Sequence, residues 1–281
     1  MAAITALISK SLTKCWMKIN ESNYYSTEAN KHYLSASSYK EAMKCEACYA
    51  AQLAGTYKSP DTRALILGSL VDELLTGTKK SIETFFEANK DNLYTKKGEP
   101  YADVQRALNA VERVKKQPLM MHYLSGKHQL IMTGEIDGID WRIKMDSYKG
   151  GKFIADLKYL KDLGTGNPFK NPIKEWGYDT SMAVYQEIVY QKTGKRLPVF
   201  LVIVTKEEVP RCEVCEIKQW NLDEALEDVK KNQPRVVAVR DGLVVPENCK
   251  VCDFCASTME ISAPIDSDLL GMSAKQIRTL Y

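Results

Sequence analysis

The sequence predicts a single α/β domain whose centre is a mixed β-sheet of about five strands, flanked by helices. Leu197–Thr205 is a mostly apolar run rich in β-branched residues, which is typical of a buried central strand. Trp141–Leu160 alternates polar and apolar residues around a Gly-Gly break, as two strands joined by a turn do. Segments with helical spacing of apolar residues, such as Ala64–Gly77, alternate with these strands and would cover the sheet.

The length and hydrophobic content of the chain are sufficient for one large hydrophobic core. It has 281 residues, of which 44% are hydrophobic, and a formal net charge of +3. Because this charge is small, any nucleic-acid surface has to be a local basic patch. There is no apolar run long enough to cross a bilayer and no signal peptide, so we expect a cytoplasmic protein with no membrane partner. The eight cysteines would then be reduced thiols or metal ligands rather than disulfides.

Three parts are expected along the chain. Residues 1–32 are an N-terminal extension without visible chemistry, in which Ile4–Ile19 is a candidate helix. Residues 33–262 form the main domain, and residues 263–281 form a C-terminal tail.

The first helix of the main domain is expected to have a capping box at Ser38 and Glu41 and to end at Gly55. Ala64–Gly77 is the next helix, with a continuous apolar stripe that would face the core. Further helices are expected at Lys79–Gln117, Trp176–Gln191 and Asn221–Lys231.

Two short turns are expected between the strands. Asp137-Gly138 and Gly150-Gly151 are the two turn signals. In the last strand, Cys212 and Cys215 are an odd number of residues apart, so they would lie on opposite faces and be structural. The five strands are expected at Leu130–Ile136, Trp141–Asp146, Phe153–Tyr159, Leu197–Thr205 and Arg211–Ile217.

Two carboxylates and an ammonium group converge on the predicted hairpin within Trp141–Leu160. Asp146 lies near the end of the first strand, and Asp156 lies across the hairpin from it. Lys158 follows Asp156 by two residues and shares its face, whereas Leu157 between them faces the core. Oxygen ligands for a hard cation beside a fixed positive charge suit metal-dependent phosphodiester hydrolysis. The alternative is a solvated ion pair on an exposed strand face.

Asp146 followed by Asp156-Leu157-Lys158 resembles the signature of the PD-(D/E)xK nucleases, and Met145 stands where many members have proline. The nearest branch is the phage-type RecE and lambda-like exonucleases, within the RecB-like group. The resemblance covers roughly Tyr33–Cys255 and implies a restriction-endonuclease-like core. Gln186 and Tyr190 resemble the Gln-x-x-x-Tyr helix that follows the catalytic hairpin in RecB-like nucleases.

The resemblance implies an exonuclease that digests one strand of duplex DNA from its 5′ end and leaves single strand for an annealing protein of RecT type. Mg²⁺, for which Mn²⁺ can substitute, would be held by Asp146, Asp156 and the Leu157 carbonyl. Lys158 would orient or help to deprotonate the attacking water. Gln186 would act at the catalytic centre, where it and Tyr190 would line the DNA side.

A fourth oxygen ligand is implied by the helix Ala64–Gly77. Gly68-x-x-x-Asp72 has the spacing of the Gly-x-x-x-His of RecB-like nucleases, in which the histidine helps to ligate the metal. Helical geometry alone does not choose between Asp72 and Glu73, but the resemblance favours Asp72 as a metal ligand.

Cys249-x-x-Cys252-x-x-Cys255 is a second local signal, because three thiolates at this density suit a zinc ion or an iron–sulfur cluster. Some RecB-like nucleases hold a [4Fe–4S] cluster with one cysteine before the core and three after it. Cys45 or Cys48, which would share a helix face, would supply the first ligand. The alternative is a set of free thiols on an irregular loop.

Two other functions stay open. One is an iron–sulfur RecB-like nuclease with a role in CRISPR systems or DNA repair, and the other is a non-catalytic DNA-binding module with the same fold. Lambda-like exonucleases thread duplex DNA through a ring, which implies a homo-oligomeric ring for this chain. The basic residues around the hairpin that would line its channel are Lys149, Lys152, Lys158 and Lys161.

Overall fold

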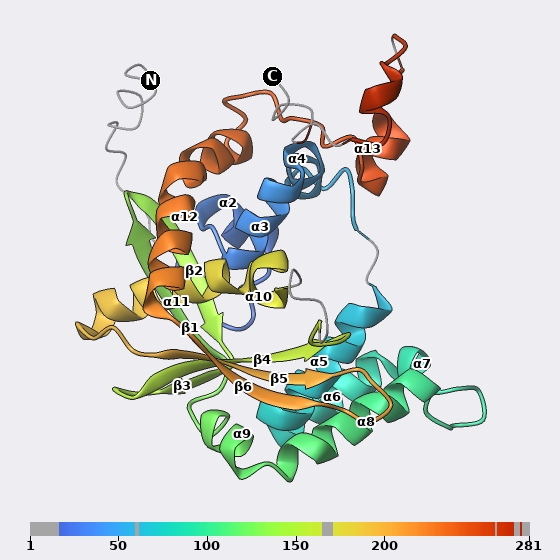
Figure 1. The fold of residues 1–281 in the computed structure, drawn as a ribbon, viewed down its shortest axis with the longest axis vertical. Helices are drawn as coiled ribbons and strands as arrows, with labels where there is room; N and C mark the ends of the chain where they lie inside the picture. The colour runs from blue at the N-terminus through green and yellow to red at the C-terminus, as the bar shows by residue number, and fades with distance from the viewer. Residues whose placement is uncertain (1–16, 60–61, 165–170, 262, 273–275, 277–281) are drawn as a thin grey trace.

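The computed structural model describes most of the chain, in the ranges 17–59, 62–164, 171–261, 263–272 and residue 276. Its helices and strands form a mixed α/β arrangement, as the sequence predicts (Figure 1). The helix expected over Ile4–Ile19 lies largely outside these ranges, and residues 17–19 are not helical. In the described ranges, no helix is long and apolar enough to span a bilayer.

The strands of the described residues form two sheets, which corrects the expectation of one sheet of about five strands. The larger sheet has the order β3 (Ser147–Lys149), β4 (Phe153–Leu160), β5 (Val199–Thr205), β6 (Cys212–Ile217). β4 and β5 are parallel, whereas the two outer pairs are antiparallel, so the sheet is mixed. The smaller sheet pairs β1 (Leu130–Ile136) with β2 (Ile139–Met145) in antiparallel register.

The two sheets meet at a bend in the chain at Asp146. The strand expected over Trp141–Asp146 does not pair with β4; it is β2, and it pairs with β1 up to Leu130↔Met145. The reason is the tight Asp137-Gly138 turn, in which both residues have positive φ and which brings β1 and β2 together. Only after Asp146 does the chain join the larger sheet, where the short β3 pairs with β4.

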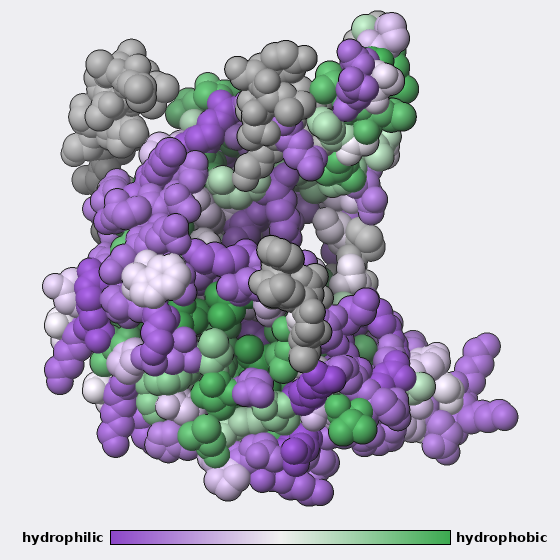
Figure 2. Space-filling view, viewed as in Figure 1, coloured by the Kyte–Doolittle hydropathy of each residue, from purple (hydrophilic) through white to green (hydrophobic). Residues whose placement is uncertain are grey.

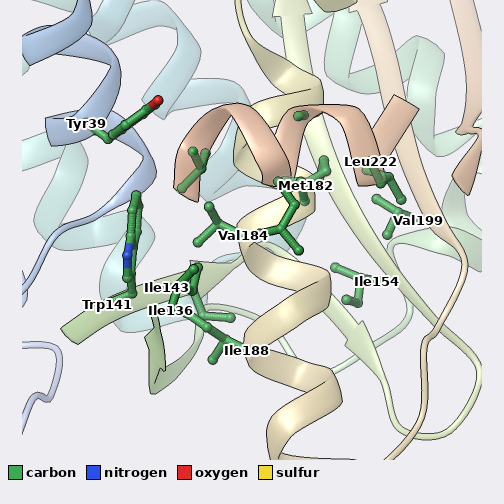
Figure 3. Packing of buried hydrophobic residues seen from close by; sticks show 14 of the residues in the cluster. Tyr39, Ile136, Trp141, Ile143, Ile154, Met182, Val184, Ile188, Val199 and Leu222 are labelled. Atoms are coloured by element: carbon green, nitrogen blue, oxygen red, sulfur yellow. The ribbon is translucent and has the colours of Figure 1, made fainter. Parts of the chain in front are cut away.

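The larger sheet lies between two hydrophobic cores, because residues on both faces of β4 and β5 are apolar. On one face, Ile154 and Leu201 pack with α11 (Tyr178–Thr193) and α12 (Gln219–Arg240). Figure 3 shows Val184 and Ile188 of α11 beside Ile143 and Ile136 of the smaller sheet, and Met182 of α11 near Leu222 of α12.

On the other face of the sheet, Leu157 of β4 and Val202 of β5 pack with α5 (Arg63–Thr76) and α8 (Ala102–Lys115). Cys212 contacts this second core and Cys215 contacts the first. The expectation that these two cysteines occupy opposite faces of a strand is therefore confirmed.

Several helices differ in extent from the sequence-based expectations. The helix expected to end at Gly55 is two helices, α3 (Ala36–Lys44) and α4 (Glu46–Leu53), because Cys45 between them has an extended backbone. Its capping box is formed by Ser35 and Ser38, not by Ser38 and Glu41.

The charged segment Lys79–Gln117 is also divided, because a turn with a bridge between Tyr94 and Pro100 interrupts it. The helix expected over Trp176–Gln191 begins only at Tyr178, because Gly177, in the left-handed region at φ 59°, separates α11 from the short helix that ends at Glu175. α12 extends well beyond Asn221–Lys231 and continues through Pro234. The remaining helices are α2 (Thr27–His32), α6 (Lys79–Ala88), α7 (Lys90–Leu93), α9 (Pro118–Tyr123), α10 (Pro172–Glu175), α13 (Asp253–Thr258) and the 3₁₀ helix η1 (Ser267–Leu269).

Candidate active site and cysteine cluster

The bend after β2 places the Asp146 carboxylate against the central strand β4. Its Oδ2 atom accepts a hydrogen bond from the backbone N–H of Leu157 at 2.9 Å. The antiparallel register pairs Ser147 with Ala155, so the next residues outward, Asp146 and Asp156, lie side by side. The first two acids of the predicted site are therefore brought together, although by a bend rather than by a simple hairpin.

Asp156 and Lys158 lie on one face of β4 and form an ion pair. The Asp156 side chain is buried, and Lys158 Nζ also donates a hydrogen bond to the Leu157 carbonyl at 3.1 Å. Leu157 itself packs into the second core on the opposite face. This alternation follows from the two-residue period of a strand.

Asp72, and not Glu73, is the acid of α5 that faces this group. Its Oδ1 accepts a hydrogen bond from Thr76 Oγ1 at 2.8 Å, and its Oδ2 accepts one from Gln129 Nε2 at 3.1 Å. Glu73 instead accepts a hydrogen bond from Ser81 on α6 at 2.7 Å. The burial of Asp72 and then the charge of Asp156 raise the pKa of Asp72.

The carboxylates repel one another, and Lys158 is the cation that partly compensates them. Burial, followed by the charges of Asp156 and Asp72, raises the pKa of Asp146 well above its usual range. Burial alone would lower the pKa of Lys158, but the charges of Asp156 and Asp146 outweigh it and raise that pKa. Lys158 is therefore held as a cation by its neighbours.

The residues present fit a hard divalent cation. Carboxylate oxygens of Asp72, Asp146 and Asp156, together with the Leu157 carbonyl, are the oxygen ligands that Mg²⁺ and Mn²⁺ prefer. Burial, followed by the charges of neighbouring carboxylates, raises the pKa values of Asp72 and Asp146, and a bound divalent cation would favour their ionised forms. The three carboxylates do not all converge within 4.8 Å, since the four cysteines described below are the only such group in the described residues.

Two tyrosines of α11 and a lysine of α3 complete the surroundings of the site, and the sequence analysis missed all three. Lys158 Nζ lies 5.3 Å from the ring centroid of Tyr178, and Lys40 Nζ lies 5.7 Å from the same centroid. Burial, followed by the charge of Asp156, raises the pKa of Tyr185. Tyr178 and Tyr185 are seven residues apart, so two turns of the helix put them on the same side, and this spacing was the available signal.

Lys40 differs from Lys158 in having no close carboxylate partner among the described residues. Its Nζ donates a hydrogen bond to the Trp176 carbonyl at 3.4 Å. Burial and then the charge of Lys158 lower the pKa of Lys40 to about 8. The site therefore has a second ammonium group that forms no ion pair with the described residues.

Two tyrosines of the segment before residue 33, which was expected to be an extension without visible chemistry, lie beside β2. Arg142 lies over the ring of Tyr24 at 5.0 Å, and Lys144 lies over the ring of Tyr25 at 5.6 Å. Burial, followed by the charges of Asp146 and Asp72, raises the pKa of Tyr25. Tyr25 is therefore close enough to Asp146 and Asp72 to be affected by their charge.

Gln186 and Tyr190 are not brought to the carboxylates. Gln186 is 2% exposed, and its Nε2 donates hydrogen bonds to the Leu197 carbonyl and to Gln219 Oε1, both at 2.9 Å. Tyr190 lies on the surface, with Arg196 over its ring at 4.7 Å. Gln186 is thus used to join α11 to the starts of β5 and α12, and its placement gives no support to a role at the DNA side.

Four cysteines far apart in the sequence come together at a second position. The Sγ atoms of Cys45, Cys249, Cys252 and Cys255 all lie within 4.8 Å of one another. Cys45 caps the start of α4 instead of sharing a helix face with Cys48, and Cys48 is outside the group. Four thiols that meet at one point could bind zinc or an iron–sulfur cluster.

Comparison with known proteins identifies relatives of the chain. A family model described as "PDDEXK-like domain of unknown function (DUF3799)" matches residues 35–258. A crystal structure from Eubacterium rectale, named as a putative exonuclease, is 36% identical and has a TM-score of 0.84, covering 91% of this chain and 99% of that chain. A match to the crystal structure of SSO0001 covers 77% of this chain and 94% of that chain at 11% identity. Its TM-score is only 0.29. No match was found among curated proteins.

Proposed function

The chain belongs to the PDDEXK-like family DUF3799, and on that premise we propose that it is a Mg²⁺-dependent exonuclease that acts on duplex DNA. The observation that carries the proposal is the convergence of Asp146, Asp156 and Lys158 on the strand β4. The name of the Eubacterium rectale relative supports the exonuclease part. The 5′-to-3′ polarity, the phage recombination role and the closeness to RecE and lambda-like exonucleases rest on the sequence resemblance.

Asp146, Asp156, the Leu157 carbonyl and Asp72 would hold the cation. When bound, Mg²⁺ or Mn²⁺ supplies positive charge beside the scissile phosphate and lowers the pKa of an attacking water. The hydrogen bond from Leu157 N–H fixes the Asp146 carboxylate, so this acid is held in place before the substrate arrives. Thr76 and Gln129 hold Asp72 in the same way.

Lys158 would orient the water and donate a hydrogen bond to a phosphate oxygen. Its ammonium is held by Asp156 and by the Leu157 carbonyl, and its neighbours keep it protonated. We therefore assign it the role of a fixed cation that stabilises developing negative charge, rather than that of a free base. Tyr178 lies beneath both Lys158 and Lys40 and would hold the two ammonium groups apart at a set spacing.

Lys40 would bind a DNA phosphate next to the scissile one. Burial of an ammonium group without a carboxylate partner is unfavourable, and a phosphate oxygen would relieve it. Contacts of this kind give affinity without sequence preference, as an enzyme that digests any duplex end requires. A ring of several subunits and a RecT-type annealing partner are further parts of the proposal.

A second candidate function is a metal-cluster nuclease of RecB-like type with a role in DNA repair or CRISPR systems. The meeting of four cysteines, which could hold zinc or an iron–sulfur cluster, is the observation that suggests it. A non-catalytic DNA-binding module is less consistent with this site, because an intact acid-acid-lysine set is costly to keep together without a cation to bind.

An assay on end-labelled duplex DNA tests the proposal. The purified chain should release nucleotides from a 5′-labelled blunt duplex with Mg²⁺ or Mn²⁺, and EDTA should stop the reaction. Comparison with a 3′-labelled duplex gives the polarity, and a covalently closed circle is the control that separates exonuclease from endonuclease activity. Failure to degrade any linear duplex with either metal would contradict the proposal.

A further inference from the structure

The spacing of the four clustered thiols distinguishes between the two kinds of metal group. Cys45 Sγ lies 3.4 Å from Cys255 Sγ, and Cys249 Sγ lies 3.8 Å from Cys255 Sγ. All four Sγ atoms lie within 4.8 Å of one another. Around a single tetrahedral zinc with Zn–S bonds of about 2.3 Å, neighbouring sulfurs are about 3.8 Å apart. A [4Fe–4S] cube puts four irons and four sulfides between its cysteines, so its thiolates have to lie farther apart.

Backbone N–H groups are already aimed at the sulfur atoms. Cys249 Sγ accepts hydrogen bonds from Val251 N at 3.5 Å and from Cys252 N at 3.3 Å. Cys252 Sγ accepts one from Cys255 N at 3.5 Å, and Cys45 Sγ accepts one from Cys48 N at 3.4 Å. Such donors stabilise thiolate charge and orient a metal ligand.

The backbone around Cys249 and Cys252 turns so that the cysteine side chains face one another and nearby N–H groups. Lys250 has φ 66°, a left-handed conformation that is uncommon outside glycine and that closes the turn between Cys249 and Cys252. Cys45 and Cys252 occupy the N-cap positions of α4 and α13, where helix N–H groups point at their side chains. These are independent features of a site built for thiolate.

The chain just before Cys249 is bonded to α4, where Glu247 N–H donates to Glu46 Oε2 at 2.9 Å and the Glu247 carbonyl accepts from Ala47 N–H at 3.1 Å, but α13 itself has few buried contacts. Cys255 is the only buried residue of α13, whereas Val251 is 60% exposed and Ile261 is 89% exposed. In Figure 1 this segment stands out from the body of the molecule beside α4, and Figure 2 shows apolar side chains on its surface. Its other attachments include a contact between the rings of Phe254 and Tyr57 at 5.1 Å.

We propose that Cys45, Cys249, Cys252 and Cys255 bind one Zn²⁺ ion in a closed tetrahedral site that fastens the segment around α13 to α4. The four thiols give up their protons to solvent as the ion binds, and no ligand changes its oxidation state. Because four protein ligands fill the coordination sphere, the ion has no open position for a water or a substrate. The site is therefore structural, and it does not depend on the nuclease assignment.

Metal analysis of the full chain tests the assignment. The protein is purified under anaerobic conditions from cells supplied with both iron and zinc, and zinc, iron and acid-labile sulfide are measured per chain. We expect one zinc per chain, iron at background level and no visible absorption band. X-ray absorption at the zinc edge should give four sulfur neighbours at about 2.3 Å. Stoichiometric iron with sulfide, or a chain that retains neither metal, would overturn the proposal.

Variants identify the ligands. Cys249→Ser should lower the zinc content at least tenfold, whereas Cys215→Ser, a cysteine outside the cluster, should leave it unchanged. Cys48→Ser should also retain zinc, because Cys48 is not in the group of four. Equal zinc content in Cys249→Ser and the wild-type chain would overturn the ligand set.

A second measurement covers the case in which Cys249→Ser fails to fold. Zinc is removed from the folded wild-type chain with a chelator and a thiol-binding mercurial, and the product is treated with protease. Cleavage near α13 should become at least tenfold faster than in the zinc-loaded chain, while the central sheet stays intact. An unchanged cleavage rate after complete zinc removal would contradict the fastening role.

Discussion

The backbone N–H of Leu157 donates a hydrogen bond to the Asp146 carboxylate at 2.9 Å, and this bond ties the bend after β2 to the central strand of the other sheet. One acid of the site therefore belongs to the junction between the two sheets, whereas Asp156 and Lys158 belong to β4 itself. The position of Asp146 depends on the pairing of β3 with β4, which places Asp146 beside Asp156.

Substitution of Asp156 or Lys158 should remove catalysis while leaving the fold and DNA binding in place. Asp156→Ala removes a proposed cation ligand, and Lys158→Ala removes the fixed cation, so each should slow cleavage by about 100-fold or more. Turnover on labelled duplex is measured alongside circular dichroism and DNA binding. Glu73→Ala is the matched control, because Glu73 bonds to Ser81 outside the site. Near wild-type turnover in a folded Asp156→Ala or Lys158→Ala protein would show that the catalytic residues lie elsewhere.

Asp72 should lie at the cation and Glu73 should not. In crystals soaked with Mn²⁺, the anomalous signal should lie within direct or one-water reach of the Asp72 carboxylate. In solution, Asp72→Asn should raise the Mg²⁺ concentration that gives half-maximal cleavage, and Glu73→Gln should leave it unchanged. A metal peak at Glu73 would mean that the helix register taken from Gly-x-x-x-Asp72 is wrong.

The raised pKa of Asp146 predicts how stability depends on pH. A carboxyl group whose pKa is higher in the folded than in the unfolded state makes the folded chain bind more protons between the two values. Its contribution to stability is therefore present at low pH and is lost as the pH rises through that window. Asp146→Asn keeps an acceptor for Leu157 N–H but has no carboxyl group to ionise. In EDTA its stability should not fall with rising pH in this way, and at pH 8 it should melt at a higher temperature than the wild-type chain.

With saturating Mg²⁺, the wild-type chain should melt at a higher temperature than Asp146→Asn, because the cation favours the ionised carboxylate. Differential scanning fluorimetry between pH 5 and 8, with EDTA or with Mg²⁺, measures both effects. If the wild-type chain melted higher than Asp146→Asn in EDTA at pH 8, the charge repulsion inferred for this site would be absent.

Gln186→Ala should lower stability and leave the chemistry largely intact. The change removes hydrogen bonds to the Leu197 carbonyl and to Gln219 and leaves buried partners unpaired, at a cost of about 1–3 kcal/mol. Urea unfolding gives the loss of stability, and kcat on duplex DNA is compared in the same protein. Tyr178→Leu removes the ring that contacts Lys158 and Lys40. It should lower kcat and leave the free energy of unfolding largely unchanged. A large fall in kcat for Gln186→Ala at unchanged stability would restore its expected role at the DNA.

The parts of the site that could be predicted from the sequence are those that depend on local periodicity. Asp156 and Lys158 share a face because a strand repeats every two residues, whatever the strand packs against. The choice of Asp72 over Glu73 required the resemblance, because both acids flank the same apolar stripe. Cys45 was found as a candidate ligand, although its backbone breaks the helix that was expected to carry it.

What could not be predicted depends on contacts between distant elements. Tyr24 and Tyr25 lie against Arg142 and Lys144 of β2, and no local sequence pattern near residue 24 predicts that contact. Gln186 is a residue that the sequence places at the site and that the structure places elsewhere. Helical spacing indicates which residues share a face with Gln186, but not that this face meets Gln219 and Leu197 instead of the site. The division into two sheets likewise follows from a competition between two turns, which periodicity does not resolve.

Assembly into a ring is the remaining prediction. At a net charge of +3, a single subunit has little long-range attraction for DNA, but several subunits around one channel would combine their local basic residues. Head-to-tail contacts that close on themselves would make such a ring a trimer or tetramer and would let a weakly specific enzyme act processively. Light scattering at micromolar concentration, with and without duplex, measures the mass, and a trap of excess unlabelled duplex measures processivity. A monomeric mass in both conditions, together with distributive cleavage, would exclude the ring and favour the repair-type nuclease, because trapping of the strand would then have no structural basis.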